Sequence, residues 1–256
     1  MRADLFLVRN GYAESREAAR RSIEAGLVRI DGKTVKKPSE PVDESLTHSV
    51  IFDAALRYVS RGGLKLEAAL DAFRLNVTGL SAVDIGASTG GFTDCLLQHG
   101  ALRVAAVDAG HGQLAAGLAA DPRVINIEGK NARELLPSDL PFVPDLAVMD
   151  VSFISQTLIL PRVAGLLPEN GCAVTLIKPQ FEAGRAALGK GGIVKSPDDR
   201  KAAVRRVIAA GAQVGLFASH ICDSPIEGGD GNREYLVLFR KKPDILPKNE
   251  LDRLKY

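Results

Sequence analysis

Residues 81–92, SAVDIGASTGGF, decide the fold class of this 256-residue chain. An apolar run typical of a buried strand leads into a loop with glycines at positions 86, 90 and 91, and a helical pattern, FTDCLLQHG, follows. Glycines let the backbone turn tightly and let a ligand approach the main chain closely. The stretch therefore predicts a strand, a ligand-binding loop and a helix.

Outward from this loop, apolar segments alternate with helical ones along the chain. RVAAVDAG precedes QLAAGLAA, VINIEG follows, DLAVMDVSF precedes a helix that reaches about residue 167, and CAVTLIK comes next. This alternation predicts a doubly wound parallel sheet. After a helix over 198–213, two further strands, GLFASHICDS and REYLVLF, are expected to pair antiparallel. We expect an α/β, Rossmann-like domain over 63–242 and a polar, peripheral tail over 243–256.

The first 55 residues predict a small α+β domain, joined to the rest by a linker over 56–62. Residues 3–10 form an amphipathic pattern that stops at Gly11, and Ser15 is placed to cap a second helix that ends at Gly26. Asp31-Gly32 accepts the positive φ angles of a type I′ turn, so residues 28–30 and 33–35 are expected to form a hairpin.

Basic residues are concentrated at the N-terminus, although the formal net charge is only +2. Residues 1–37 hold nine Lys and Arg against five Asp and Glu. A concave surface that binds RNA phosphates is the functional interpretation, and a solvated charged face is the alternative. With few aromatic residues to stack on bases, recognition is expected to rest on RNA backbone and shape. The expected RNA-binding residues are Arg16, Arg20, Arg29, Lys33, Lys36 and Lys37.

Several classes of protein are disfavoured by composition. The three cysteines, at 95, 172 and 222, are scattered and lack Cys-x-x-Cys spacing, which argues against a disulfide framework or a zinc site. No apolar run approaches the roughly 18 residues of a membrane helix, and no signal peptide is evident. We expect a cytoplasmic protein with no metal site and no membrane partner.

The glycine loop and the ends of the following strands predict a cofactor site. The loop lacks the dinucleotide pattern Gly-x-Gly-x-x-Gly, and its leading acid would suit a cationic amino-acid group better than a pyrophosphate; S-adenosylmethionine has such a group and no phosphate. Asp108 ends the second strand, where an acid typically binds ribose hydroxyls, and Asn131 is placed to meet the adenine edge. The alternative is that these are ordinary turn residues. The expected binding residues are Asp84, Gly86, Ala87, Ser88, Gly90, Gly91, Phe92, Asp108, Asn131 and Asp150.

Residues 184–190, GRAALGK, fit the first seven positions of a phosphate-binding P-loop. Position 191 is Gly, however, where Ser or Thr would bind magnesium, and no strand is expected immediately before the segment. We interpret GKGGIVKSP, residues 189–197, as a basic loop beside the substrate, with a surface loop of no function as the alternative.

An ordered series of motifs then resembles a known family over nearly the whole chain. The motifs are SRGGLKLEAAL, DIGASTGGFTD, NAREL, MDVSFIS, LIKPQFE, GKGGIV and GNREYL. The resemblance is to the TlyA proteins, ribosomal RNA ribose methyltransferases that also carry the name hemolysin. It implies a class I methyltransferase domain of the FtsJ type and an N-terminal domain similar to the RNA-binding domain of a small-subunit ribosomal protein. It further implies S-adenosylmethionine as cofactor and ribosomal RNA as substrate.

The resemblance also implies a catalytic tetrad of Lys65, Asp150, Lys178 and Glu234 for methylation of a ribose 2′-hydroxyl, with cytidine as the expected nucleotide. Lys178 would be the general base, and because a free lysine titrates near about 10.4, a second cation such as Lys65 would help to keep it neutral. Thr89 stands where FtsJ proteins usually have proline, which favours TlyA. The alternatives are a non-catalytic RNA-binding assembly factor and a membrane-active hemolysin, and composition speaks against the latter.

Overall fold

The computed structural model describes the chain except residues 14, 25, 53–56, 229–230 and 244–245. The chain divides into two compact units, Met1–Arg61 and Gly62–Tyr256, which are described separately. The domain boundary expected after residue 55 lies outside the described residues. The second helix, expected to end at Gly26, spans Arg16–Glu24, and Gly26 has φ of 73°.

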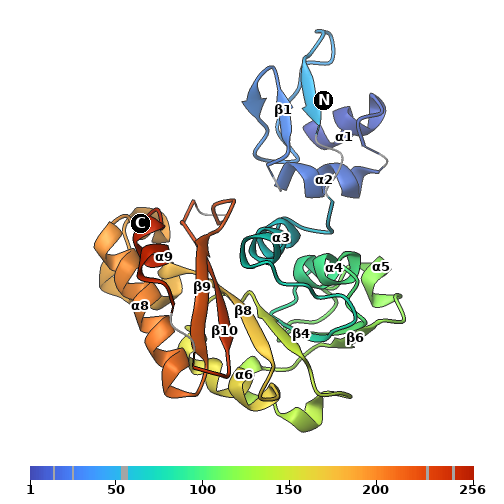
Figure 1. Cartoon of the computed structure of the whole chain (residues 1–256). Helices are drawn as coiled ribbons and strands as arrows, with labels where there is room; N and C mark the ends of the chain where they lie inside the picture. The colour runs from blue at the N-terminus through green and yellow to red at the C-terminus, as the bar shows by residue number, and fades with distance from the viewer. Residues whose placement is uncertain (14, 25, 53–56, 229–230, 244–245) are drawn as a thin grey trace. The chain divides into compact units, whose positions relative to one another are not determined.

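The larger unit is built on one mixed sheet (Figure 1), with seven strands among the described residues. Its order is β6-β5-β4-β7-β8-β10-β9, in which the first five strands run parallel and β10 runs antiparallel to both of its neighbours. This confirms the expected α/β fold and the antiparallel final pair. The strands are β4 (Ser81–Ile85), β5 (Arg103–Val107), β6 (Val124–Ile127), β7 (Leu146–Met149), β8 (Cys172–Ile177), β9 (Phe217–Asp223) and β10 (Tyr235–Arg240).

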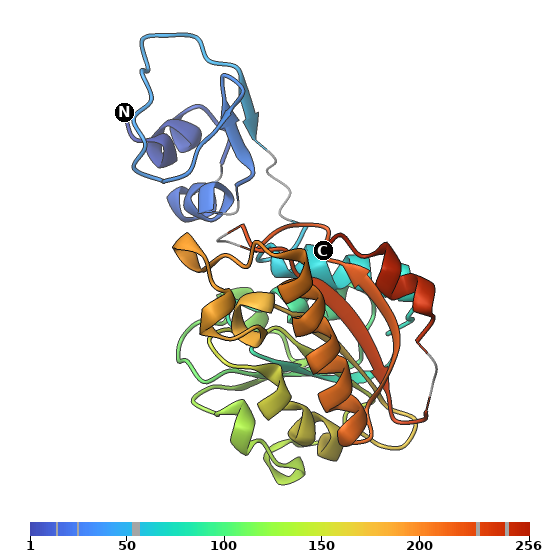
Figure 2. The same ribbon diagram turned by 90° about the vertical axis from the view of Figure 1, so that its left-hand side faces the viewer.

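Helices cover both faces of this sheet, which explains why β4, β7 and β8 are buried along their whole length. In Figure 2, α8 and α6 lie in front of the sheet, whereas α3 and α4, which pack against each other, lie behind it. Pro197 begins α8, and the Ser196 side chain caps it by accepting from the Asp199 N–H at 3.2 Å. The helices are α3 (Gly62–Phe73), α4 (Gly91–Gln98), α5 (Ala116–Ala119), α6 (Leu160–Leu166), α7 (Pro179–Glu182) and α8 (Pro197–Gln213).

The register of the sheet aligns the carboxyl ends of its parallel strands. Ile85 at the end of β4 pairs with both Val107 of β5 and Met149 of β7. Because β10 runs the opposite way, its first residue, Tyr235, pairs with Ile177 at the end of β8. The residues that follow four parallel strands and the residue that precedes β10 therefore meet at one edge.

The C-terminal segment differs from the expected peripheral tail. It contains helix α9 (Lys248–Arg253), and Leu254 beyond it is buried in the core of the larger unit. Glu250 accepts a hydrogen bond from the Ile221 N–H of edge strand β9 at 2.8 Å, and its other oxygen lies 2.9 Å from His220 Nδ1. An edge strand exposes main-chain donors that need partners, and this segment supplies one.

The smaller unit packs helices α1 (Ala3–Arg9) and α2 (Arg16–Glu24) on a sheet of order β2-β1-β3. The cap at Ser15 is confirmed, because its Oγ accepts from the Ala18 N–H at 3.1 Å. The turn is confirmed as well, because Asp31 (φ 52°) and Gly32 (φ 75°) both have positive φ. The sequence did not predict the third strand. The strands are β1 (Val28–Ile30), β2 (Lys33–Thr34) and β3 (Val50–Phe52).

Asp4 is the buried charge of this unit. Its carboxylate lies 2.9 Å from the Arg2 Nε and 2.9 Å from the Arg16 Nε, and it is fully inaccessible to solvent. Hydrogen bonds from Arg2, and then from Arg16, lower the pKa of Asp4 to about 2. A carboxyl with a lowered pKa stabilises the fold above its ordinary pKa and loses that contribution as the pH falls towards 2.

We predict that Asp4→Asn destabilises the N-terminal unit by about 1–2 kcal/mol at pH 7, because the two half-exposed guanidinium groups lose their anion. Near pH 2 the difference between the variant and the parent should fall below about 0.5 kcal/mol, since Asp4 is then about half protonated. Urea titrations of the full-length protein, followed by NMR signals of α1 and α2 at both pH values, measure this. Glu17→Gln, an exposed acid of α2, is the matched control; an equal loss from Asp4→Asn at both pH values would contradict the prediction.

Candidate active site

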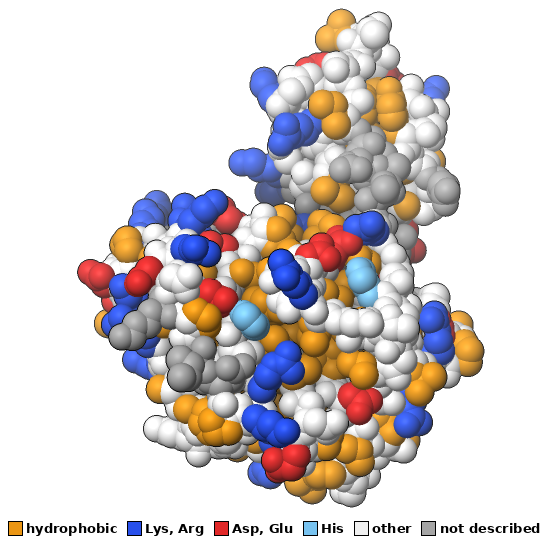
Figure 3. Space-filling model, in the orientation of Figure 1, with side chains coloured by type: hydrophobic (Ala, Val, Ile, Leu, Met, Phe, Trp, Pro, Cys, Tyr) orange, Lys and Arg blue, Asp and Glu red, His pale blue; other side chains and the backbone are white. Residues whose placement is uncertain are grey.

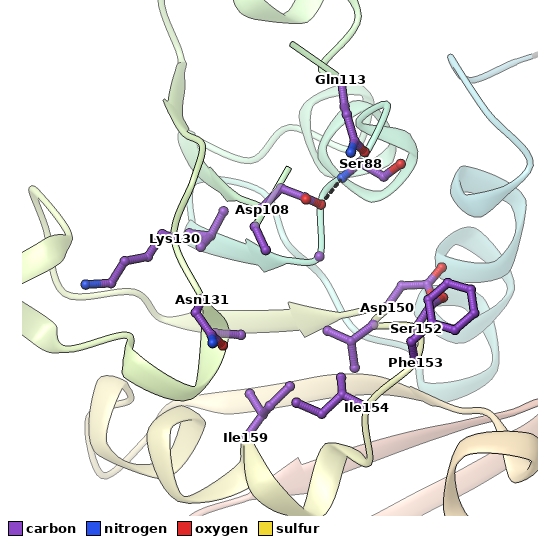
Figure 4. Close-up of a pocket in the computed structure, with 15 residues that line it drawn as sticks. Ser88, Asp108, Gln113, Lys130, Asn131, Asp150, Ser152, Phe153, Ile154 and Ile159 are labelled. Atoms are coloured by element: carbon purple, nitrogen blue, oxygen red, sulfur yellow. Dashed lines mark hydrogen bonds between the residues drawn. The ribbon is translucent and has the colours of Figure 1, made fainter. Parts of the chain in front are cut away.

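A pocket of about 500 Å³ opens at the carboxyl edge of the parallel strands. In Figure 4, Asp108 and Ser88 lie close together, Lys130 and Asn131 lie on one side, and Asp150, Ser152 and Phe153 on the other. Its remaining lining is largely apolar. The lining residues are Gly86, Ser88, Val107, Asp108, Ala109, Gln113, Lys130, Asn131, Ala132, Asp150, Val151, Ser152, Phe153, Ile154 and Ile159.

The glycine loop after β4 forms one wall of the pocket and needs glycine at two positions. Gly86 has φ of 84°, and a Cβ there would lie 2.6 Å from the Asp150 carbonyl oxygen. Gly90 has φ of 96° at the N-cap of α4, and a Cβ there would lie within 2.3 Å of Leu118. The loop therefore depends on close approach of its backbone to two neighbouring segments.

Asp108 and Asn131 line the pocket at the ends of β5 and β6, where the sequence placed them. The Asp108 carboxylate accepts from the Ser88 N–H at 2.8 Å and from the Gly110 N–H at 2.7 Å, so it fixes the glycine loop. Asn131 Oδ1 accepts from the Arg133 N–H at 3.0 Å as the cap of a short 3₁₀ helix (Ala132–Glu134). Asn131 is therefore both a turn residue, as the alternative interpretation held, and a residue that lines the pocket.

Asp84 lies away from the pocket, although its carboxylate was expected beside a cationic ligand group. It is fully buried, and one oxygen accepts from the Thr93 N–H at 2.9 Å and the Thr93 hydroxyl at 2.7 Å, which ties β4 to α4. Its other oxygen has no hydrogen-bond partner among the described residues. Burial, the largest cause, raises the pKa of Asp84 to about 7. Four other expected cofactor residues also lie outside the lining: Ala87, Gly90, Gly91 and Phe92.

The structure brings together the four residues of the expected tetrad in two ion pairs. Lys65 Nζ on α3 lies 2.5 Å from Glu234 Oε2, and both residues are buried, at 7% and 3% exposure. Lys178 Nζ lies 2.6 Å from Asp150 Oδ1 and donates a hydrogen bond to Ser152 Oγ at 2.8 Å. The Lys178 contact with Asp150 is an ion pair without hydrogen-bond alignment, because that carboxylate oxygen makes no hydrogen bond. Lys65, the expected second cation, is itself matched by Glu234.

Glu234 is electrically coupled to the other three side chains. Burial raises its pKa, while Lys65 and Lys178 act to lower it and Asp150 acts to raise it. Gly228 leaves room for this carboxylate, since a Cβ there would lie 2.6 Å from Glu234 Oε1. The four groups therefore form one electrostatic cluster beside the pocket.

Ten of the fifteen lining residues were not among those expected, and four of these have polar or aromatic side chains: Gln113, Lys130, Ser152 and Phe153. Ser152 and Phe153 follow Asp150 within the MDVSFIS motif, so their position at the pocket could have been predicted from the motif. No motif or strand end marks Gln113 in the sequence. Phe153 stands out because it is 93% exposed with φ of 65°, and its ring lies 5.3 Å from that of Phe181. Positive φ is uncommon for a residue with a bulky side chain, and a fully exposed ring is uncommon as well, so Phe153 is a candidate contact residue at the rim of the pocket.

The six expected RNA-binding residues lie in the smaller unit. Arg16 pairs with Asp4, and Arg20 lies 3.4 Å from Glu24 on the same helix. The others are exposed, but Arg29 pairs with Thr34 across the hairpin whereas Lys33 pairs with Ile30, so Arg29 and Lys33 lie on opposite faces. Figure 3 shows most of the Lys and Arg side chains visible on this unit along its left-hand side.

The P-loop-like segment does not follow a strand. Helix α7 precedes it, and its residues form two 3₁₀ turns, Arg185–Ala187 and Lys190–Gly192. Within the described part of the chain, no helix is long and apolar enough to cross a membrane.

Comparisons with known proteins agree with this architecture. A family model described as FtsJ-like methyltransferase matches residues 58–241, and an S4 domain model matches residues 1–47. The chain is 43% identical over 243 residues to the 16S/23S rRNA (cytidine-2′-O)-methyltransferase TlyA of Mycobacterium tuberculosis, covering 95% of this chain and 91% of that one. It is 41% identical to Hemolysin A of Brachyspira hyodysenteriae, covering 93% and 99%. A solved structure from Streptococcus thermophilus, also named a hemolysin, is 42% identical with a TM-score of 0.78, covering 98% and 93%.

We predict that Gly86→Ala destabilises the larger unit by about 1–3 kcal/mol, because a side chain at positive φ would also press on the Asp150 carbonyl. Gly117→Ala is the matched control, since its added methyl meets no atom within 4 Å and it lies in helix α5, where alanine is favoured by up to about 1 kcal/mol. Thermal unfolding followed by circular dichroism measures both. Equal melting temperatures for the two variants would show that the close approach at Gly86 is not needed.

Proposed function

The chain belongs to the TlyA family of FtsJ-like methyltransferases, and from that premise we propose that it transfers a methyl group from S-adenosylmethionine to the 2′-hydroxyl of a cytidine ribose in ribosomal RNA. One observation carries the proposal: two ion pairs, Lys178 with Asp150 and Lys65 with Glu234, lie together at the edge of a pocket of cofactor size. The named TlyA relative acts on 16S and 23S rRNA cytidines, which gives the substrate class. The cytoplasm, where ribosomal RNA is found, is the proposed place of action.

The pocket residues fit S-adenosylmethionine. Asp108 presents a carboxylate for ribose hydroxyls, while Ala132 and Ile159 offer apolar surface for a flat base, with Asn131 beside them. Gly86 has no side chain, so the cofactor could approach the main chain there, and Asp150 places a carboxylate in the lining for the sulfonium group of the cofactor. The cofactor, when bound, supplies an electrophilic methyl group. The acid with which the loop begins, Asp84, takes the supporting role of fixing α4 behind the pocket.

Lys178 is the proposed general base. A ribose hydroxyl is a poor nucleophile, so its proton must be removed as it attacks, and the enzyme must orient it in line with the methyl group. Lys178 can accept this proton only as the neutral amine, so the ammonium of its ion pair with Asp150 would first release a proton to solvent. The 2′-hydroxyl proton would then pass to Nζ. Asp150, 2.6 Å away, then stabilises the ammonium that forms, and Ser152 fixes the direction of Nζ. Glu234 pairs with Lys65, so the two lysines of the cluster are matched in charge by its two acids.

The S4 domain is the proposed RNA-binding unit. Arg29, Lys33, Lys36 and Lys37 are exposed, and their charges would neutralise phosphates without reading bases. Because Arg29 and Lys33 lie on opposite faces of the hairpin, the RNA backbone would have to follow the hairpin's edge.

Methyl transfer from labelled S-adenosylmethionine to unmethylated ribosomal subunits, followed by mapping of 2′-O-methylcytidine, tests the activity. We predict that Lys178→Met lowers the rate by about 100-fold or more, as expected for loss of a general base, while cofactor affinity changes by less than about threefold. Lys242→Met, an exposed lysine beyond β10, is the control and should retain full activity.

A Lys178→Met variant as active as the parent would exclude Lys178 as the base. A parent protein that binds subunits but never transfers label would instead indicate a non-catalytic assembly factor.

A separate prediction concerns RNA affinity. Replacing Lys36 and Lys37 together by alanine should reduce the slope of log affinity against log salt by about 1.5, since each phosphate contact contributes about 0.7–0.9. Arg9→Ala is the control, because Arg9 already pairs with Glu44 at 2.9 Å. Filter binding to ribosomal RNA at several salt concentrations measures the slopes; equal slopes for the double variant and the parent would remove this pair from the interface.

A further inference from the structure

The loop after β7 and the segment after β8 run beside each other and touch along their length. Asp150 and Ser152 contact Lys178, and the ring of Phe153 lies 5.3 Å from that of Phe181. The contacts continue to Glu182, the last residue of α7. The proposed base and its partner acid thus lie at one end of a paired stretch, and Glu182 lies at the other.

Glu182 is the buried anchor of this stretch, at 3% exposure. One carboxylate oxygen accepts from the Ser155 hydroxyl at 2.5 Å, and the other accepts from the Gln156 N–H at 2.8 Å. Ser155 also caps a 3₁₀ helix (Gln156–Leu158) by accepting from the Thr157 N–H. Both oxygens of Glu182 therefore hold the far end of the loop that carries Asp150.

A second connection joins the same two segments. The Gln156 side chain donates to the Leu176 carbonyl at 3.2 Å and accepts from the Thr175 hydroxyl at 2.7 Å, and both partners belong to β8. All of these groups are buried. Gln156 therefore fixes the loop to the strand that leads directly into Lys178.

This network has a cost that packing alone would not require. Burial raises the pKa of Glu182, which means that its charged form is disfavoured where it stands. Arg206 of α8 is part of the arrangement, since its guanidinium donates to the Glu182 carbonyl at 2.5 Å and its charge favours the carboxylate. Apolar side chains of similar volume could fill such a position, but they could not specify hydrogen-bonded geometry.

We propose that Glu182 is a positioning residue for methyl transfer, which holds residues 150–156 against residues 178–182 so that Asp150 stays in contact with the Lys178 ammonium. The part of this inference that concerns catalysis rests on the proposed function. It assigns a role to the KPQFE motif beyond Lys178 itself. A misplacement of about 1 Å in such a contact is enough to cost about 100-fold in rate.

Glu182→Ala and Glu182→Gln separate positioning from simple stabilisation. Alanine removes both acceptors, so kcat should fall by about 10- to 100-fold and the pH–rate profile should shift, with the cofactor Kd within about threefold. Glutamine can accept from the Gln156 N–H and donate to Ser155 Oγ, so it should restore kcat to within about threefold. Glu169→Ala, an exposed acid after α6, is the matched control.

A readout independent of activity is the Lys178 side-chain NMR signal at Cε, assigned by its loss in Lys178→Met. It should move in Glu182→Ala and stay in place in Glu182→Gln and Glu169→Ala. If Glu182→Ala does not fold, Ser155→Ala takes its place. It removes one of the two contacts of Glu182, so the signal should move in the same way but by less.

A lowered melting temperature, with kcat, pH profile and the Lys178 signal all unchanged, would overturn the positioning role. Failure of the proposed function looks different: the parent itself would then transfer no methyl group, and the NMR comparison would still decide whether Glu182 positions Lys178.

Discussion

The parallel register of the central sheet is the constraint on which the site depends. Because β4, β5, β7 and β8 end at one edge, Ser88, Asp108, Asp150 and Lys178, which are 20 to 90 positions apart in the sequence, meet there without any local signal that links them. The antiparallel direction of β10 adds Glu234, which precedes that strand and therefore lies next to the end of β8. A strand order with β10 parallel would carry the same residue to the opposite edge and leave Lys65 buried without an anion.

The buried ion pair of Lys65 and Glu234 is a poor candidate for stabilising the fold. Burial raises the pKa of Glu234 in spite of the two lysines that act on it, so desolvation outweighs the attraction that the protein supplies. A carboxyl whose pKa rises on folding makes the folded state less stable as the pH rises through the interval between the unfolded and folded values. Removal of one partner alone would still cost several kcal/mol, about 3–5, because an isolated charge would remain. The arrangement is thus more readily explained by the proposed chemistry than by stability.

The alternation of apolar and helical segments was enough to predict the parallel strands, the glycine loop and the edge at which Asp108, Asp150 and Lys178 lie. Which side chains pair there could not be predicted, because the pairing depends on the order of the strands and on where α3 packs along them. Lys65 was expected beside Lys178, and it contacts Glu234 instead. The inward turn of Asp84 depends on Thr93, one helical turn into α4, and has no sequence signal. The polar composition of residues 243–256 concealed helix α9, whose Leu251 packs on the core together with Leu254 just beyond the helix.

The N-terminal unit shows why a count of basic residues overstates the charge that a partner meets. Arg2 and Arg16 surround a buried Asp4, so part of their charge is used in folding, and Arg20 faces Glu24 on the same helix. Of the six expected cations, the four that form no ion pair among the described residues are Arg29, Lys33, Lys36 and Lys37. These four residues lie on the hairpin and just beyond it, on both faces of the hairpin. None of them lies on α2, although the sequence had also predicted RNA-binding residues on that helix. An RNA bound through these charges would therefore be held by a narrow edge, which suits a duplex or folded backbone better than a flat surface does.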